Sequence, residues 1–286
     1  MTLKDALDYG KANLVKADIQ EANLDAWYLL EYVSHVSRAT YYGNPDYILE
    51  EEQETLYKEV IAQRCKRIPL QHITGVQEFM GFVFRVNEHV LIPRQDTEIL
   101  VETALDHIPK DLTRRENTSE KIKVLDMCTG SGCILISLMQ MRETIEGTGV
   151  DISKEALKVA KMNADLNHVS CSFIESDLFE NIEGRYDVIV SNPPYIRTQV
   201  IEELEEEVKL HDPMLALDGR EDGIYFYKKI IESAREYLNP EGMLFFEIGH
   251  DQGEVVANEM RNQKFLEVKV KKDLAGLDRV VYGHVQ

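Results

Sequence analysis

Residues 122–151 read IKVLDMCTGSGCILISLMQMRETIEGTGVD, and this stretch decides the fold. IKVLDM is a short apolar run typical of a buried strand, CTGSG predicts a tight loop, CILISLMQM predicts a helix, and GTGVDI predicts a second strand. A strand, a crossover helix and another strand form the unit from which parallel sheets are built. The stretch therefore predicts an α/β fold.

The same alternation continues to the C-terminus. The predicted elements are a helix from Ser153 to about Leu166, strands at CSFIES and YDVIVSN, a rigid loop at NPPYI, a helix from about Gly223 to Leu238, a strand at GMLFFEIG, a helix from about Gln252 to Asn262, and closing strands at FLEVKV and DRVVYGH. The last two strands have no helix between them, so one should be antiparallel. We therefore expect a Rossmann-like sheet, mostly parallel, with an antiparallel last strand.

The N-terminal part of the chain has a different texture. Apolar positions recur at helical spacing from Thr2 to about Arg67, with a loop at Tyr41–Pro45 before a helix resumes in EEEQETLYKEVIAQRCK. From Gly75 to Arg94 the runs EFMGFVFRV and HVLIPR alternate like two strands, which predicts a hairpin with its turn at Asn87–Glu88. The expected domains are a small helical domain over 1–74, a β-hairpin linker over 75–94 and a catalytic domain over 95–286.

Two further segments complete this outline. A helix should run from Asp96 to about His107, with Asp96 or Thr97 as its cap, and the polar stretch Pro109–Glu120 should be a surface loop. The acidic run EELEEE at Glu202–Glu207 is interpreted as a solvated helical face.

The charge of the chain indicates which classes of partner to expect. The formal net charge of the 286 residues is −19, whereas proteins that grip nucleic-acid phosphates usually carry a basic stripe. An acidic surface suits small molecules or basic protein segments, or it serves solubility alone. The acidic charge leads us to expect no direct nucleic-acid partner. We also expect no membrane association, because the apolar runs are too short to cross a bilayer.

The cysteines and the N-terminus indicate a compartment. Cys65, Cys128, Cys133 and Cys171 form no C-x-x-C pair, so no zinc site is expected. A chain of this size without dense cysteines fits a reducing cytoplasm, and its charged N-terminus lacks the apolar core of a secretory signal.

The first polar motif lies where the strands end. Cys128-Thr129-Gly130-Ser131-Gly132 follows a strand that ends near Asp126, and Leu135 replaces the last glycine of a dinucleotide fingerprint. A nucleoside without phosphates does not need that close contact. Asp151 ends the next strand, where a carboxylate can accept hydrogen bonds from ribose hydroxyls.

The third predicted strand ends in Ser176-Asp177-Leu178, which would border an adenine ring, with Asp177 accepting from its exocyclic amine. Asp126 and Asp177 can alternatively be ordinary helix or turn caps. In the order in which they occur, these residues favour a nucleoside site.

The second motif is Asn192-Pro193-Pro194-Tyr195, directly after a buried strand. The two prolines rigidify the backbone and remove two N–H donors, which leaves the Asn192 side-chain oxygen and the Pro193 carbonyl as acceptors. Two acceptors can hold a planar –NH2 group, aim its nitrogen at a methyl donor and stabilise the developing positive charge. Tyr195 can stack on a flat amide or base.

These motifs resemble those of the release factor glutamine methyltransferases, the PrmC/HemK family. The similarity extends over nearly the whole chain through IPRQDTE at Ile92–Glu98, LDMCTGSG, Val150-Asp151, SNPPYI, Phe246-Glu247-Ile248-Gly249 and Asp273–Arg279. It implies an S-adenosylmethionine-dependent methyltransferase that methylates the glutamine of the Gly-Gly-Gln motif in peptide-chain release factors and leaves S-adenosylhomocysteine.

The resemblance also assigns residues to roles. The cofactor would be held by Cys128–Gly132, Asp151, Leu178 and Asn192. From their positions at strand ends, Asp126 and Asp177 would also contact it. The glutamine would be held by Asn192, Pro193, Pro194 and Tyr195. The family usually has glycine at Cys128 and proline at Gln95, but neither departure removes a group with a chemical role. Arg94 would contact the site or form a linker salt bridge, and Glu247 would line the site or cap a sheet edge.

Two other functions remain open from the sequence. An amino methyltransferase that acts on adenine or guanine in nucleic acid would use the same NPPY chemistry, and salt-sensitive DNA or RNA binding would favour it. A catalytically silent adaptor that binds a partner through the helical domain is the other, although intact Asn192 and Tyr195 argue against it.

Overall fold

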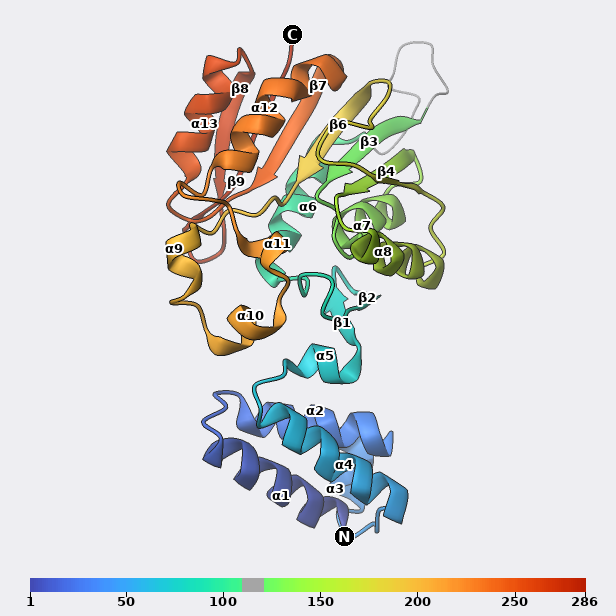
Figure 1. Cartoon of the computed structure of the whole chain (residues 1–286). Helices are drawn as coiled ribbons and strands as arrows, with labels where there is room; N and C mark the ends of the chain where they lie inside the picture. The colour runs from blue at the N-terminus through green and yellow to red at the C-terminus, as the bar shows by residue number, and fades with distance from the viewer. Residues whose placement is uncertain (110–120) are drawn as a thin grey trace. The chain divides into compact units, whose positions relative to one another are not determined.

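The computed structural model describes residues 1–109 and 121–286, which form two compact units (Figure 1). Unit 1 contains Met1–Val76 and Glu205–His211, and unit 2 contains Gln77–Leu204 and Asp212–Gln286. The segment Glu205–His211 lies inside the range predicted for the catalytic domain, yet it packs with unit 1. Residues 110–120 of the predicted surface loop lie outside the described residues.

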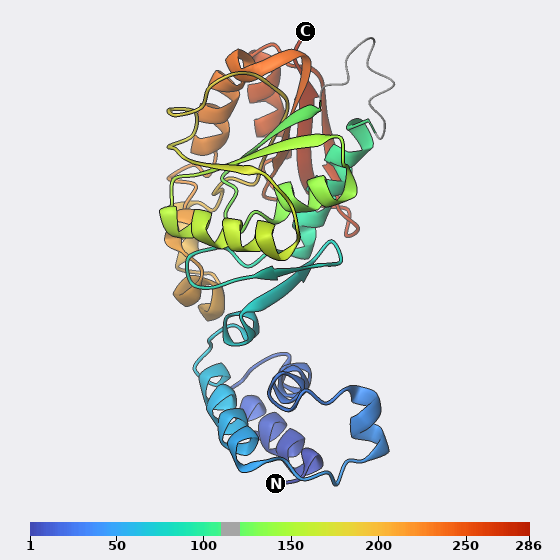
Figure 2. The ribbon, with the colours of Figure 1, turned by 90° about the vertical axis from the view of Figure 1, so that its right-hand side faces the viewer.

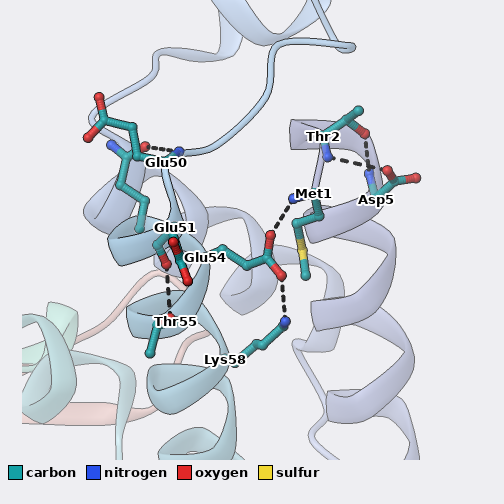
Figure 3. A network of polar contacts seen from close by, with 9 residues as sticks. Met1, Thr2, Asp5, Glu50, Glu51, Glu54, Thr55 and Lys58 are labelled. Carbon is teal, nitrogen blue, oxygen red and sulfur yellow. Dashed lines mark hydrogen bonds and ion pairs between the residues drawn. The ribbon is translucent and has the colours of Figure 1, made fainter.

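Unit 1 is a set of helices around one apolar core that includes Leu14, Leu30 and Tyr57. Its start is fixed because Thr2 and Asp5 exchange side-chain hydrogen bonds with each other's backbone and the Met1 ammonium group pairs with Glu54 (Figure 3). The elements are α1 (Leu3–Lys16), α2 (Ala22–Ser34), α3 (Arg38–Gly43), α4 (Glu51–Arg64), α5 (Leu70–Thr74) and α10 (Glu206–His211).

Two predictions about these segments were wrong. Tyr41 to Gly43 belong to the short helix α3, which begins because the Ser37 side chain accepts a hydrogen bond from the Thr40 N–H. The acidic run is not a solvated face along its whole length. Glu207 lies 2.8 Å from the buried Arg64, which also bonds the buried Asp25 at 2.7 Å. This ion pairing holds α10 in unit 1.

Unit 2 contains the predicted mostly parallel sheet, with strand order β5-β4-β3-β6-β7-β9-β8. β9 is antiparallel to both of its neighbours, which confirms the expected antiparallel last strand. The order reverses between β3 and β6, and ligands of open α/β sheets bind at such a switch point. The strands are β3 (Ile122–Met127), β4 (Ile145–Asp151), β5 (Ser172–Glu175), β6 (Tyr186–Ser191), β7 (Leu238–Glu247), β8 (Leu266–Lys272) and β9 (Asp278–His284).

Helices cover both faces of the sheet, as buried parallel strands require. Residues of α6 and α7 share one apolar cluster with Val124, Val190 and Phe245, whereas α12 and α13 share the other with Leu125 and Ile189. The covering helices are α6 (Gln95–His107), α7 (Cys133–Met141), α8 (Lys154–Leu166), α12 (Tyr225–Tyr237) and α13 (Gly253–Asn262).

A hairpin lies within the predicted range, but its strands and its turn differ from the predicted ones. Its strands are β1 (Val76–Phe79) and β2 (Phe82–Arg85), and the turn is Met80-Gly81, where both residues have positive φ (53° and 77°). That backbone suits a two-residue hairpin, and Gly81 adopts it without strain. The run HVLIPR is not a strand. β2 lies beside α8, as Figure 2 shows.

Helix α6 begins at Gln95, and the predicted side-chain cap was wrong. Its cap is Arg94, with no side-chain hydrogen bond. Asp96 pairs with Arg279 instead, and Thr97 is buried. The sequence did not predict α9 (Thr198–Ile201) and α11 (Met214–Leu217), and the helix expected at Glu202–Glu207 begins only at Glu206, as α10.

In the part of the chain that the structure describes, no helix is both long enough and apolar enough to cross a membrane.

Candidate active site

A cavity of about 800 Å³ opens at the carboxyl ends of the central strands in unit 2. The loop after β3, the end of β4, the loop after β5 and the loop after β6 all contribute to its wall. The lining residues include Arg94, Thr97, Cys128, Thr129, Gly130, Ser131, Asp151, Ile152, Asp177, Leu178, Phe179, Asn192 and Pro194. Sequence-distant residues thus meet at the predicted edge of the sheet.

The loop Cys128–Gly132 is shaped by its own backbone. Cys128, Gly130 and Gly132 all have positive φ, at 64°, 54° and 79°. A methyl group at Gly132 would lie 2.9 Å from the Ile136 side chain and 3.3 Å from the Ala160 side chain, so only glycine fits there. The loop therefore follows from residues within it and from the two helices that it touches.

Cys128 adopts a backbone that glycine prefers. A non-glycine residue in the left-handed region costs about 1 kcal/mol. Burial raises the pKa of the Cys128 thiol well above its usual range, and the nearby Asp151 raises it further. The thiol is thus an uncharged part of the cavity wall.

Asp126 and Asp151 have different surroundings. Asp151 lines the cavity, and its two oxygens accept hydrogen bonds from the Gly130 and Ser153 N–H groups, both at 2.9 Å. Asp126 is fully buried and is not among the lining residues; its Oδ2 accepts from the Thr129 hydroxyl at 2.6 Å. Burial raises the pKa of Asp126 to about 7. Asp126 holds the loop from behind, and Asp151 faces the cavity.

Asn163 is a buried support that the sequence did not single out. Its side-chain amide donates to the Ser131 carbonyl at 2.9 Å and to the Arg85 carbonyl at 3.0 Å, while its oxygen accepts from the Arg85 N–H at 2.6 Å. It therefore ties the loop to β2. A buried amide on the otherwise apolar face of α8 was the signal that could have revealed it.

At the far end of the cavity, Asp177 and Leu178 lie where the third predicted strand ends. Asp177 is exposed, and Leu178 has a positive φ of 50°. With Ile152 and Phe179 they give this end one carboxylate and apolar side chains.

The Asn192–Tyr195 loop is divided between the cavity and the protein behind it. Asn192 and Pro194 line the cavity, but Pro193 and Tyr195 do not. The Asn192 side-chain amide donates to the Thr97 hydroxyl oxygen at 3.4 Å. The Tyr195 hydroxyl points to Glu247, whose Oε1 lies 3.5 Å away.

The backbone of Tyr195 is clamped by Gln252, which the sequence did not identify. The buried Gln252 amide donates to the Tyr195 carbonyl at 3.0 Å and to the Gly223 carbonyl at 3.1 Å, and its oxygen accepts from the Gly249 N–H at 3.0 Å. A methyl group at Gly219 would lie 2.7 Å from the Tyr195 Cα. Residues 219–223 and residues 249–252 therefore fix one residue of the loop.

Glu247 and Arg94 are the two residues for which the sequence left alternatives. Glu247 ends β7, is 2% exposed and lies behind the loop. Burial raises its pKa to about 7, while the Thr97 side chain and Arg279 lower it. Arg94 both lines the cavity and forms a salt bridge with Asp212 at 2.6 Å.

In the described ranges, no three His, Cys, Asp or Glu side chains are grouped so that they could hold a metal ion. The groups that face the cavity fit a nucleoside. Asp151 has free lone pairs for hydroxyl groups, and Ile152, Leu178 and Phe179 offer apolar surface to a flat ring.

Comparison with known proteins agrees with this geometry. Residues 5–75 match the family model of the PrmC N-terminal domain, and residues 97–210 match the methyltransferase small domain. A methyltransferase of Pyrococcus furiosus superposes with a TM-score of 0.53 at 17% identity, covering 78% of this chain and 98% of that one, which shows a shared fold.

Two curated relatives extend over almost the whole chain. The release factor glutamine methyltransferase of Geobacter sulfurreducens is 38% identical, covering 99% of this chain and 97% of that one. The protein of the same name from Clostridium acetobutylicum is 40% identical, with 98% of each chain covered.

The sheet, its cavity and the matched domain define a methyltransferase fold. With relatives of this identity along its length, the chain belongs to the family of release factor glutamine methyltransferases.

Proposed function

We propose that this protein methylates the side-chain amide nitrogen of the glutamine in the Gly-Gly-Gln motif of peptide-chain release factors. The observation that carries the proposal is the position of Asn192, which presents a side-chain amide at the cavity wall directly before Pro193 and Pro194. The identity of the substrate follows from the relatives, which are release factor glutamine methyltransferases.

The residues around the cavity have distinct tasks in this proposal. S-adenosylmethionine supplies an electrophilic methyl group and leaves as S-adenosylhomocysteine. Asp151 would accept from the ribose hydroxyls, and Asp177 and Leu178 would border the adenine. The loop Cys128–Gly132 and Asn192 would complete this pocket, with Asp126 supporting the loop through Thr129.

The substrate amide needs orientation more than a base. Its nitrogen is a weak nucleophile because its lone pair is delocalised. The Asn192 side-chain oxygen and the Pro193 carbonyl would accept its two hydrogens, hold the nitrogen in line and stabilise the positive charge that develops. Pro194 would bound the amide plane from the cavity wall, with Tyr195 behind it, and the proton can leave to water after transfer.

We also propose that the helical domain, residues 1–74, contacts the release factor outside its glutamine. One glutamine side chain offers little discrimination by itself, so a second contact is needed for specificity. A full-length release factor should therefore be a better substrate than a short Gly-Gly-Gln peptide, in kcat/KM.

The test is mass spectrometry of a purified release factor after incubation with the protein and S-adenosylmethionine. One added methyl group on the Gly-Gly-Gln peptide is the expected result. Calorimetric titration with S-adenosylmethionine, on wild type and Asp151→Ala, checks the cofactor pocket without turnover. Cofactor binding without methylation of the release factor would contradict the proposal and direct the search to adenine or guanine in nucleic acid.

A further inference from the structure

Asn192 and Thr97 of the cavity wall meet Glu247, which lies behind the wall, although the three residues come from different elements. β6 and β7 are parallel neighbours with Ser191 opposite Phe246, so the next residues, Asn192 and Glu247, lie side by side at the ends of these strands. Thr97 on α6 is 2% exposed and bonds the Asn192 side chain. Thr97 and Asn192 are 95 residues apart in the sequence, so no local sequence pattern predicts this cluster.

The direction of the hydrogen bonds in this cluster matters for function. An asparagine amide has a donor end and an acceptor end, and a substrate –NH2 group needs the acceptor. The Asn192 Nδ2 donates to the Thr97 oxygen, which leaves Oδ1 for the substrate. If the Thr97 hydroxyl donated to Asn192 instead, the amide would turn and present its own hydrogens to the substrate.

The Thr97 hydroxyl can accept in this way only while its single proton points elsewhere. Glu247 is the nearest candidate acceptor: its Oε2 is buried and has no hydrogen-bond partner among the described residues, and the Thr97 side chain lowers the pKa of this carboxyl, as a hydroxyl that donates to it would. Its other oxygen, Oε1, faces the Tyr195 hydroxyl. An ionised Glu247 can therefore accept hydrogen bonds from both hydroxyl groups and can donate none.

We infer that Thr97 and Glu247 are positioning residues that keep the Asn192 amide turned with its oxygen toward the nitrogen to be methylated. The inference rests on the proposed function for the identity of that nitrogen. The charge state of Glu247 sets the direction of the whole relay, from Asn192 through Thr97 to the carboxylate.

Protonation should reverse this relay. A neutral Glu247 can donate to Thr97, whose hydroxyl then turns to Asn192. Because burial raises the pKa of Glu247 to about 7, kcat should rise with pH through about 7 and fall below it. The titratable or charged groups that face Glu247 are Asp96 from α6, Tyr195 from the loop after β6, Tyr227 from α12, Cys133 from α7 and Arg279 from β9.

The experiment compares Thr97→Val, Thr97→Ser and Glu247→Gln with wild type on a full-length release factor. Thr97→Val keeps the shape and removes the hydroxyl, so kcat should fall on the order of 10- to 100-fold with little change in KM. Thr97→Ser should restore kcat to within a few fold. Glu247→Gln should lower kcat and abolish its rise through pH 7.

A merely structural role would give a different result. In that case Thr97→Val and Thr97→Ser would lower thermal stability while their kcat values and pH profiles matched wild type, and this outcome would overturn the inference. In an Asn192→Ala background, Thr97→Val should cause no further loss. A full second loss would show that Thr97 does not act through Asn192.

The orientation of the Asn192 side-chain amide can also be measured without turnover. The side-chain amide signals of Asn192 in ¹⁵N-labelled protein, assigned by their loss in Asn192→Ala, should shift as pH crosses about 7 and should not do so in Thr97→Val. Unshifted signals in the wild type would contradict the inference even if no release factor were methylated. Inactivity of the wild type would contradict the proposed function alone.

Discussion

Two loops line the same cavity, but they are held in opposite ways. The loop Cys128–Gly132 takes its shape from positive backbone dihedral angles and from contacts within one strand–helix unit. The loop Asn192–Tyr195 is held by buried side chains from three distant elements, Thr97, Glu247 and Gln252. A loop that must fit a ligand closely can be set by glycine, whereas a loop that must aim one nitrogen needs support from outside.

The largest expected effect comes from the second loop itself. Asn192→Ala should lower kcat by roughly 100-fold or more, because it removes a preorganised acceptor for the developing charge. Steady-state methylation of a release factor measures it, with the exposed Asn258→Ala as control. Turnover close to that of the control would remove Asn192 from the reaction.

The next largest effect should come from replacing Gln252, which supports the Asn192–Tyr195 loop from another part of the chain. Gln252→Met keeps the side-chain length but leaves the buried Tyr195 and Gly223 carbonyls without their partner, which should lower the free energy of unfolding by about 3 kcal/mol. Urea unfolding measures this change. Gln263→Met, just beyond the other end of α13, is the control and should change stability by less than about 0.5 kcal/mol. Equal stability of the two variants would show that the clamp is dispensable.

The first loop can be tested by comparing two of its glycines. Gly132→Ala places a methyl group against Ile136 and Ala160 in a strained backbone, and should destabilise the protein by about 2 kcal/mol. Gly130→Ala has open space around its methyl group and should cost only about 1 kcal/mol. If the order were reversed in thermal or urea unfolding, close packing would not be what requires glycine at position 132.

The smallest effect is expected at Cys128. Cys128→Gly relieves the left-handed strain but adds freedom to the unfolded chain, so the net change in unfolding free energy should be within about 1 kcal/mol. Calorimetric affinity for S-adenosylmethionine should stay within a few fold of wild type. A loss of more than tenfold would show that the thiol contributes to the pocket.

The contrast between the loops also explains which parts of the site were predictable. Asp151, Gly130 and Asn192 occupy the cavity wall as predicted, because each follows a strand whose apolar pattern is strong and parallel strands end at one edge. Whether these residues bind the cofactor or substrate stays a prediction. Asp126 and Tyr195 were expected at the site, yet both lie behind the wall, since burial depends on which element packs over them.

By itself, the sequence determined the alternation of strands and helices, the mostly parallel sheet and the two motifs at its edge. Those features depend on periodicity and on residues within one strand–loop–helix unit, where local sterics decide. Only the tertiary structure decided the Met80-Gly81 turn in place of Asn87-Glu88 and the pairing of Glu207 with Arg64.

The tertiary structure also decided the arrangement of Thr97, Glu247 and Gln252 behind the second loop. The physical reason is the same for the ion pair of Glu207 and for these three side chains. A buried polar group must find a partner, and its partner is chosen by the packing of elements that are far apart in the chain.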